Sequence, residues 1–127
     1  MKDINAVVFP STENTISVKD DAEYGGAHQY EIQECRGFNP NTQKTEYSML
    51  STQRIRFIEK NSDGSMFHGL QSEQLVLMLI DRTNKLDARF PSPFNQKAIE
   101  GLQMFLDASK ERVEDRMNRD VMGELKS

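Results

Sequence analysis

The sequence predicts an α+β fold: a small N-terminal antiparallel β-sheet followed by a C-terminal antiparallel two-helix hairpin. In the first half, residues 30–34 and 54–57 alternate apolar and polar side chains with a period of two, as half-buried strands do. After Gly69, apolar residues recur at three- and four-residue spacing, which is typical of helices. The change of period near the middle of the chain predicts the two parts.

A length of 127 residues is enough for one domain. We expect a single domain over residues 1–127, with a β-region at 1–68 and a helical hairpin at 69–127. Only 36% of the residues are hydrophobic, so the core is expected to be modest and subunit association is a plausible supplement.

Shorter strand candidates complete the β-region, so that we expect four or five short antiparallel strands. Turn signals separate them, and the one at residues 61–64 predicts a hairpin turn with Gly64 at positive φ. The further strand candidates are residues 6–9, 15–18 and 46–50, and the other turn signals are Pro10-Ser11, Gly25-Gly26 and Asn39-Pro40-Asn41.

The second half predicts two helices. The first spans residues 72–86 with Ser72 as a possible N-cap, and the second runs from about residue 93 to 119 with Ser92 as N-cap and Pro93 at its first position. Apolar stripes follow both helices. The first stripe comprises Leu75, Met78, Leu79 and Leu86, and the second comprises Ile99, Leu102, Leu106, Val113 and Met117.

Composition excludes several classes of function. Lys and Arg number 16 against 20 Asp and Glu, and a net charge of −4 argues against binding a DNA or RNA polymer. The longest apolar run, residues 75–80, is too short to cross a membrane, and residues 1–5 lack a signal-peptide core. One cysteine and two histidines, His28 and His68, supply no zinc-type ligand set. We therefore expect a cytosolic protein with no metal and no cofactor.

Three arginines of the second predicted helix form a candidate binding row. Arg112, Arg116 and Arg119 stand at i, i+4 and i+7, and guanidinium groups suit phosphate. The same pattern also fits a solvated helix flank neutralised by neighbouring acids.

Two residues near the inter-helix loop are further candidates. Phe90 can pin the helices together or stack on a base, and Asn95 can satisfy helix N-terminal donors or meet a phosphate or ribose. Neither a glycine-rich phosphate loop nor a nucleophile motif occurs in the sequence, so an enzyme is the less favoured interpretation.

Spaced motifs of the hairpin resemble a domain shared by phage proteins that sequester nucleotide immune signals. With the preceding β-region, the whole chain resembles the first-described Thoeris anti-defence family. The motifs are residues 69–75, residues 79–82, Arg89-Phe90-Pro91-Ser92 with Asn95, residues 111–116 and residues 119–123. One departure is Asp120, where family members commonly have Gly.

The resemblance implies a non-enzymatic sponge in the host bacterial cytoplasm. Such a protein binds cyclic ADP-ribose isomers made by TIR proteins, so that their effector stays inactive. It implies a homo-oligomer, a hexamer in some members, that also holds cyclic oligonucleotides at separate sites. Phe90 would stack on the base, Asn95 would hydrogen-bond the ligand, and Arg112 and Arg116 would bind phosphates, with Arg119 as a further contact.

Two other hypotheses stand beside the sponge. The chain can be an interaction protein that directly inhibits a host defence protein, or, less favoured, an enzyme that degrades a nucleotide. A sponge binds a small nucleotide by itself, whereas a direct inhibitor does not.

Overall fold

The computed structural model describes residues 2–3, 12, 14–20, 27–60 and 63–119. Contacts divide the chain into two compact units, Met1–Gly69 and Leu70–Ser127. The predicted α+β class is confirmed, while the expected strand at residues 6–9 and the turns at 10–11 and 25–26 lie outside the described residues. The elements are β1 (Lys2–Asp3), β2 (Ile16–Asp20), β3 (Ala27–Asn39), β4 (Lys44–Arg56), β5 (Glu59–Lys60), β6 (Met66–Phe67), α1 (Ser72–Arg89) and α2 (Pro93–Asn118).

The first unit is built on an antiparallel sheet with strand order β1-β2-β3-β4. Val18 on β2 pairs with Tyr30 on β3, which pairs with Ile55 on β4, so these side chains share one face. Val18 is only 4% exposed, and the Tyr30 ring packs edge-on against Phe57 with centroids 5.7 Å apart. This row forms the small core of the unit.

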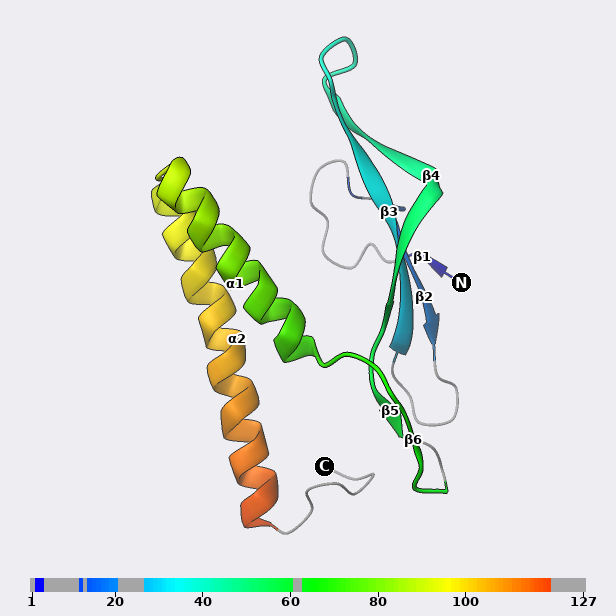
Figure 1. The fold of residues 1–127 in the computed structure, drawn as a ribbon, viewed down its shortest axis with the longest axis vertical. Helices are drawn as coiled ribbons and strands as arrows, with labels where there is room; N and C mark the ends of the chain where they lie inside the picture. The colour runs from blue at the N-terminus through cyan, green and yellow to red at the C-terminus, as the bar shows by residue number, and fades with distance from the viewer. Residues whose placement is uncertain (1, 4–11, 13, 21–26, 61–62, 120–127) are drawn as a thin grey trace. The chain divides into compact units, whose positions relative to one another are not determined.

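β3 and β4 form a long two-stranded ribbon that extends past β2 (Figure 1). The expectation of two separate strands at residues 46–50 and 54–57 was wrong, because residues 46–50 and 54–56 belong to the one strand β4. Gln33 pairs with Thr52 but Glu34 pairs with Ser48, so β4 carries a three-residue bulge. The bulge breaks the alternation, which is why one strand looks like two in the sequence.

Glu34 anchors the bulge of β4. The Ser51 hydroxyl and the Gln53 amide donate to its carboxylate, which lowers the pKa of Glu34. The two residues at the apex point into solvent, Met49 at 80% and Leu50 at 100% exposure. A bulge held by side-chain hydrogen bonds therefore presents two apolar side chains outward.

The turns follow their sequence signals where the structure describes them. The Asn39 side chain accepts from the Asn41 N–H at 2.9 Å in the turn between β3 and β4. Gly64 has a φ of 88°, as predicted for the turn between β5 and β6.

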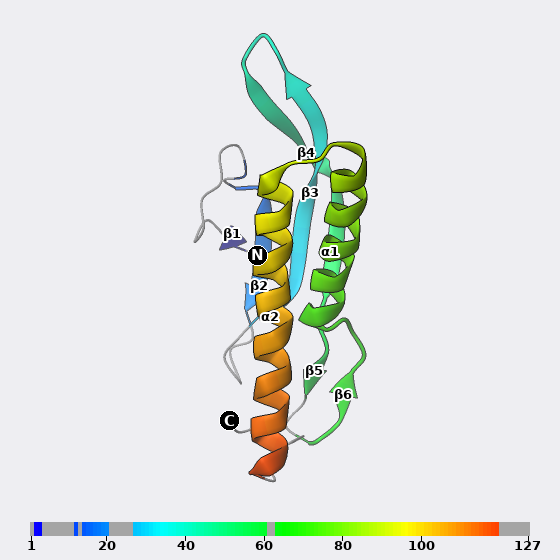
Figure 2. The same ribbon diagram turned by 90° about the vertical axis from the view of Figure 1, so that its left-hand side faces the viewer.

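The second unit is an antiparallel pair of helices that lie side by side in both views (Figures 1 and 2). α2 begins as predicted, since Ser92 accepts the Phe94 N–H at 3.2 Å and Pro93 occupies the first turn. The N-cap prediction for α1 was wrong. Gln71 is the cap, and its N–H donates to the Gln74 side chain at 2.8 Å, so Ser72 is already helical.

Each helix leaves apolar surface uncovered. On α1 the buried residue is Val76, 8% exposed. Of the predicted stripe, Leu75 is half-buried, whereas Met78, Leu79 and Leu86 are exposed. Val76 lies about 100° around the helix from Leu75, so the buried face and the predicted stripe are neighbours. α2 has 26 residues against 18 in α1, and Val113 and Met117 lie exposed on its overhanging end. The hairpin alone does not bury its hydrophobic residues.

Gly69, which ends the first unit, lies against the backbone of Phe57. A Cβ at this position would fall 2.5 Å from the Phe57 carbonyl carbon, far inside van der Waals contact. We expect Gly69→Ala to destabilise the β-unit by about 1–3 kcal/mol, because backbone cannot move aside as a side chain does. Urea denaturation checks this, with the exposed neighbour His68→Ala as control. Equal stability of the two variants would contradict the close approach.

Candidate functional site

The five predicted site residues lie at two ends of the helical hairpin. Phe90 and Asn95 belong to the turn between α1 and α2, and the row of Arg112, Arg116 and Arg119 lies at the far end of α2. Seventeen residues separate Asn95 from Arg112, which is about 25 Å along a helix. One chain therefore does not bring the two groups onto one small ligand.

A carboxylate organises the turn end. Asp87 accepts hydrogen bonds from the Ser92 N–H at 3.0 Å, from Asn95 Nδ2 at 3.2 Å and from Gln96 Nε2 at 2.8 Å. These three donors, led by the Ser92 amide, lower the pKa of Asp87 below its ordinary value. Asp87 is thereby an ionised acceptor that ties the last turn of α1 to the start of α2.

Phe90 is presented outward by this turn. It is the C-cap of α1, its N–H donates to the Leu86 carbonyl at 2.7 Å, and its side chain is 64% exposed. The Arg89 guanidinium lies over the ring, 5.4 Å from the centroid. The other face of the ring is left for a planar group such as a base, and the Arg89 cation beside it favours a ligand that also carries negative charge.

Asn95 has its amide hydrogens engaged within the turn. Nδ2 donates to Asp87 and to the Phe90 carbonyl, each at 3.2 Å. Of the two ends of the Asn95 amide, only the NH₂ group can donate to two acceptors, so Nδ2 must face the turn. The carbonyl oxygen Oδ1 is therefore the atom directed to other partners. Asn95 therefore suits a ligand amine or hydroxyl better than a phosphate, and it also fixes the carbonyl of Phe90.

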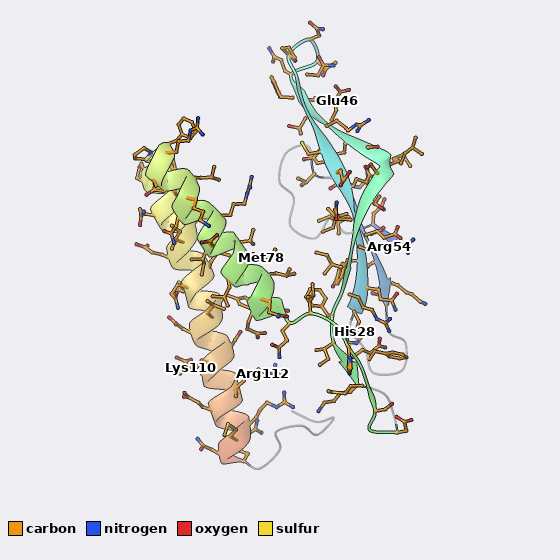
Figure 3. All side chains as sticks on the ribbon, viewed as in Figure 1. His28, Glu46, Arg54, Met78, Lys110 and Arg112 are labelled. Carbon is orange, nitrogen blue, oxygen red and sulfur yellow. The ribbon has the colours of Figure 1, made fainter. Side chains whose placement is uncertain are left out.

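The arginine row lies on the overhanging part of α2, where Figure 3 labels Arg112 near Lys110. Arg112 and Arg119 are exposed and Arg116 is half-buried. Arg119 Nη2 pairs with Asp115 Oδ2 at 2.8 Å, so that residue has a partner on its own helix. Like charges at i and i+4, as for Arg112 and Arg116, destabilise a helix by about 0.2–0.5 kcal/mol.

An open hollow of about 460 Å³ lies where the start of α1 meets the later half of α2. Arg112, Arg116 and Arg119 are not among the described residues that line it. The lining residues are Gln71, Glu73, Leu106, Ser109, Lys110, Val113 and Glu114. Its two carboxylates and one cation make it a poor match for a phosphate, so the hollow and the arginine row are distinct features.

Sequence reasoning missed Asp87 and Arg89 as part of the turn end. Asp87 precedes Ser92 by five residues, and Arg89 is adjacent to Phe90, just before the Pro91-Ser92-Pro93 segment. An acid before a Ser-Pro helix start is a signal for such a turn, because the exposed N–H groups there need an acceptor.

Two further observations concern the chemistry of the described residues. They contain no group of three or more His, Cys, Asp or Glu side chains arranged to hold a metal ion. Neither α1 nor α2 combines the length and the hydropathy that a membrane crossing requires.

Neither a family model nor a curated protein matches this sequence. The resemblance to the Thoeris anti-defence family therefore rests on the hairpin motifs and the preceding β-region.

Replacing Asp87 tests whether it ties the turn together. Because the folded state lowers its pKa, Asp87 contributes stability that is present above the unfolded-state pKa of about 3.9 and is lost as pH falls through the folded-state pKa. We expect Asp87→Ala to lower the melting temperature at neutral pH. As the pH falls below about 3.9, the melting temperatures of the variant and the parent should become progressively more similar.

Asp107→Ala is the matched control, since it removes an exposed helical carboxylate with one side-chain donor, Gln103. A melting-temperature loss for Asp87→Ala that stays constant down to strongly acidic pH would contradict the assignment.

Proposed function

We propose that this protein is a non-enzymatic sponge that sequesters a small cyclic nucleotide, chiefly a cyclic ADP-ribose isomer made by TIR proteins, in the host bacterial cytoplasm. The observation that carries the proposal is that the exposed Phe90 lies at one end of α2 and the arginine row at the other, with Asn95 and Arg112 about 25 Å apart along the helix. The chain has an aromatic ring that can stack on a base and arginines that can bind phosphate. Because they are too far apart in one chain, a small ligand contacts both only where two chains meet.

A second copy in antiparallel orientation brings the two groups together. The midpoint of Asn95 and Arg112 along α2 falls between Gln103 and Met104, so a two-fold axis there places Asn95 of one copy level with Arg112 of the other. Each such pair of chains then has two equivalent sites. Resemblance to the sponge family extends the assembly to a hexamer.

The surface of α2 suits this pairing. Phe94, Gly101, Phe105 and Ala108 lie on one side of the helix, and Phe94 and Phe105 are exposed. A Cβ on Gly101 would meet nothing within 4 Å, so the packing of one chain does not require glycine there. The midpoint of Gly101 and Phe105 is Gln103, half a residue from that axis, so each Phe105 ring lies within about 1.5 Å along the helix of the partner's Gly101.

The composite site supports binding without chemistry. Phe90 stacks on the base, Asn95 Oδ1 accepts from an amine or hydroxyl, and Arg112 and Arg116 neutralise the phosphates, with Arg119 nearby. The carboxylate at the turn, Asp87, accepts from three donors and has a lowered pKa, so it is not poised as a general base. This arrangement favours a sponge over a degrading enzyme.

One observation favours a second candidate, an interaction protein that directly inhibits a host defence protein. The bulge of β4 presents Met49 and Leu50 on a ribbon anchored by Glu34, and apolar side chains held in solvent are typical of protein-binding surfaces. A direct inhibitor has no affinity for a free nucleotide, which separates the two candidates.

Truncating the arginine row tests the phosphate contacts. Each charge-assisted hydrogen bond is worth about 1.5–3 kcal/mol, so Arg112→Ala or Arg116→Ala should weaken binding of a cyclic ADP-ribose isomer by roughly 10- to 150-fold. Titration calorimetry measures the change, with Lys97→Ala as a control on the same helix. Unchanged affinity in both variants would make the row a solvated flank and the proposed function wrong.

Mixing two inactive variants tests whether the site is shared between chains. We expect Phe90→Ala and the double variant Arg112→Ala/Arg116→Ala each to bind poorly. When the two are unfolded together and refolded as a mixture, sites that combine the intact half of each regain parental affinity. Calorimetry of the mixture should recover up to about a quarter of the sites, from random pairing of two chain types. Absence of recovery would place both groups in one chain.

A further inference from the structure

A second basic surface lies on the sheet of the first unit, which the proposed function does not use. Lys19 on β2 pairs with Gln29 on β3, which pairs with Arg56 on β4, and in the next row on the same face Glu31 pairs with Arg54. These residues surround a hollow of about 460 Å³ that Tyr30 also lines. Figure 3 labels Arg54 along β4.

The two guanidinium groups are oriented by neighbours in the sheet unit. The Arg56 guanidinium lies over the Phe67 ring at 4.5 Å from the centroid, and Nη2 is 3.9 Å from Glu59 Oε2. Arg54 Nε lies 3.2 Å from Glu31 Oε1. A guanidinium stacked on a ring keeps its N–H groups directed outward in its plane, which reduces the entropy that anion binding costs.

The residues that line this hollow carry a net positive charge, whereas the whole chain is negative. Lys19, Arg54 and Arg56 against Glu31 leave an excess of two positive charges among the lining residues, whereas the chain carries a net charge of −4. The carboxylates of Glu31 and Glu59 beside the arginines disfavour a long polyanion such as RNA. A compact anion fits better than a polymer.

We propose that this hollow is a binding site for a small soluble diphosphate, the group found in pyrophosphate and nucleoside diphosphates. Residues two apart on a strand are separated by about 6.8 Å and adjacent strands by about 4.8 Å, so the long side chains of Arg54 and Arg56 can converge on one diphosphate from two sides. Lys19 closes the other flank, and the Gln29 side chain between the cations can donate an amide hydrogen. Planar guanidinium forks match phosphate oxygens in pairs.

Titration calorimetry of the full-length protein with inorganic pyrophosphate tests the site. We expect saturable binding that weakens as NaCl rises, and a loss of about 100-fold or more in Arg54→Gln/Arg56→Gln. The matched control Arg36→Gln/Lys44→Gln removes the same charge from exposed positions of the same ribbon and should bind as the parent does. Arg54→Lys/Arg56→Lys, which keeps the charge without the fork, should bind between these extremes.

This site is independent of the proposed function, so the two can fail separately. The variant Arg54→Gln/Arg56→Gln should keep its affinity for a cyclic ADP-ribose isomer. The variant Arg112→Ala/Arg116→Ala should still bind pyrophosphate, and adding Arg54→Gln/Arg56→Gln to it should remove that binding. Absence of binding at millimolar pyrophosphate, or equal affinity in the sheet variant and its control, would overturn the site.

Discussion

The fixed length of α2 determines what one chain of this protein can bind. A helix rises about 1.5 Å per residue and does not compress, so the turn that presents Phe90 and the row that begins at Arg112 are held apart. Capping by Ser92 and the hydrogen bonds to Asp87 set the start of the helix firmly. In the proposed antiparallel pair of chains, the same rigidity gives the groups a defined spacing.

The thin interior gives a second reason to expect association. Among the described residues, Val18, Val76 and Thr15 are the buried ones, and none of them is a large side chain. Apolar side chains instead remain exposed on the outer side of α1, on α2 and at the β4 bulge. Apolar surface left in water costs roughly 25 cal/mol per Å² relative to buried apolar surface. Association that buries these side chains between chains therefore gains free energy that a single chain does not.

Local signals in the sequence were sufficient for the fold class and for several element ends. The period change, the Ser92-Pro93 helix start and Gly64 each depend on residues close in sequence. The β4 bulge depends instead on the register opposite Glu34, and the choice of Val76 over the neighbouring stripe depends on the crossing of α2. Among site residues, the roles of Asp87 and Asn95 could not be predicted, because they depend on hydrogen bonds between the end of α1 and the start of α2. The separation of about 25 Å between Asn95 and Arg112 follows from the predicted helix, which contains both residues.

Native mass spectrometry of the full-length protein with a cyclic ADP-ribose isomer tests the central claim most directly, because it reports chain count and ligand mass in one spectrum. The account predicts that the ligand appears, with unchanged mass, on assemblies of two or more chains, with no more ligands than chains, and never on the monomer. A monomer that carries the ligand, or assemblies that carry none, would contradict a site shared between antiparallel helices.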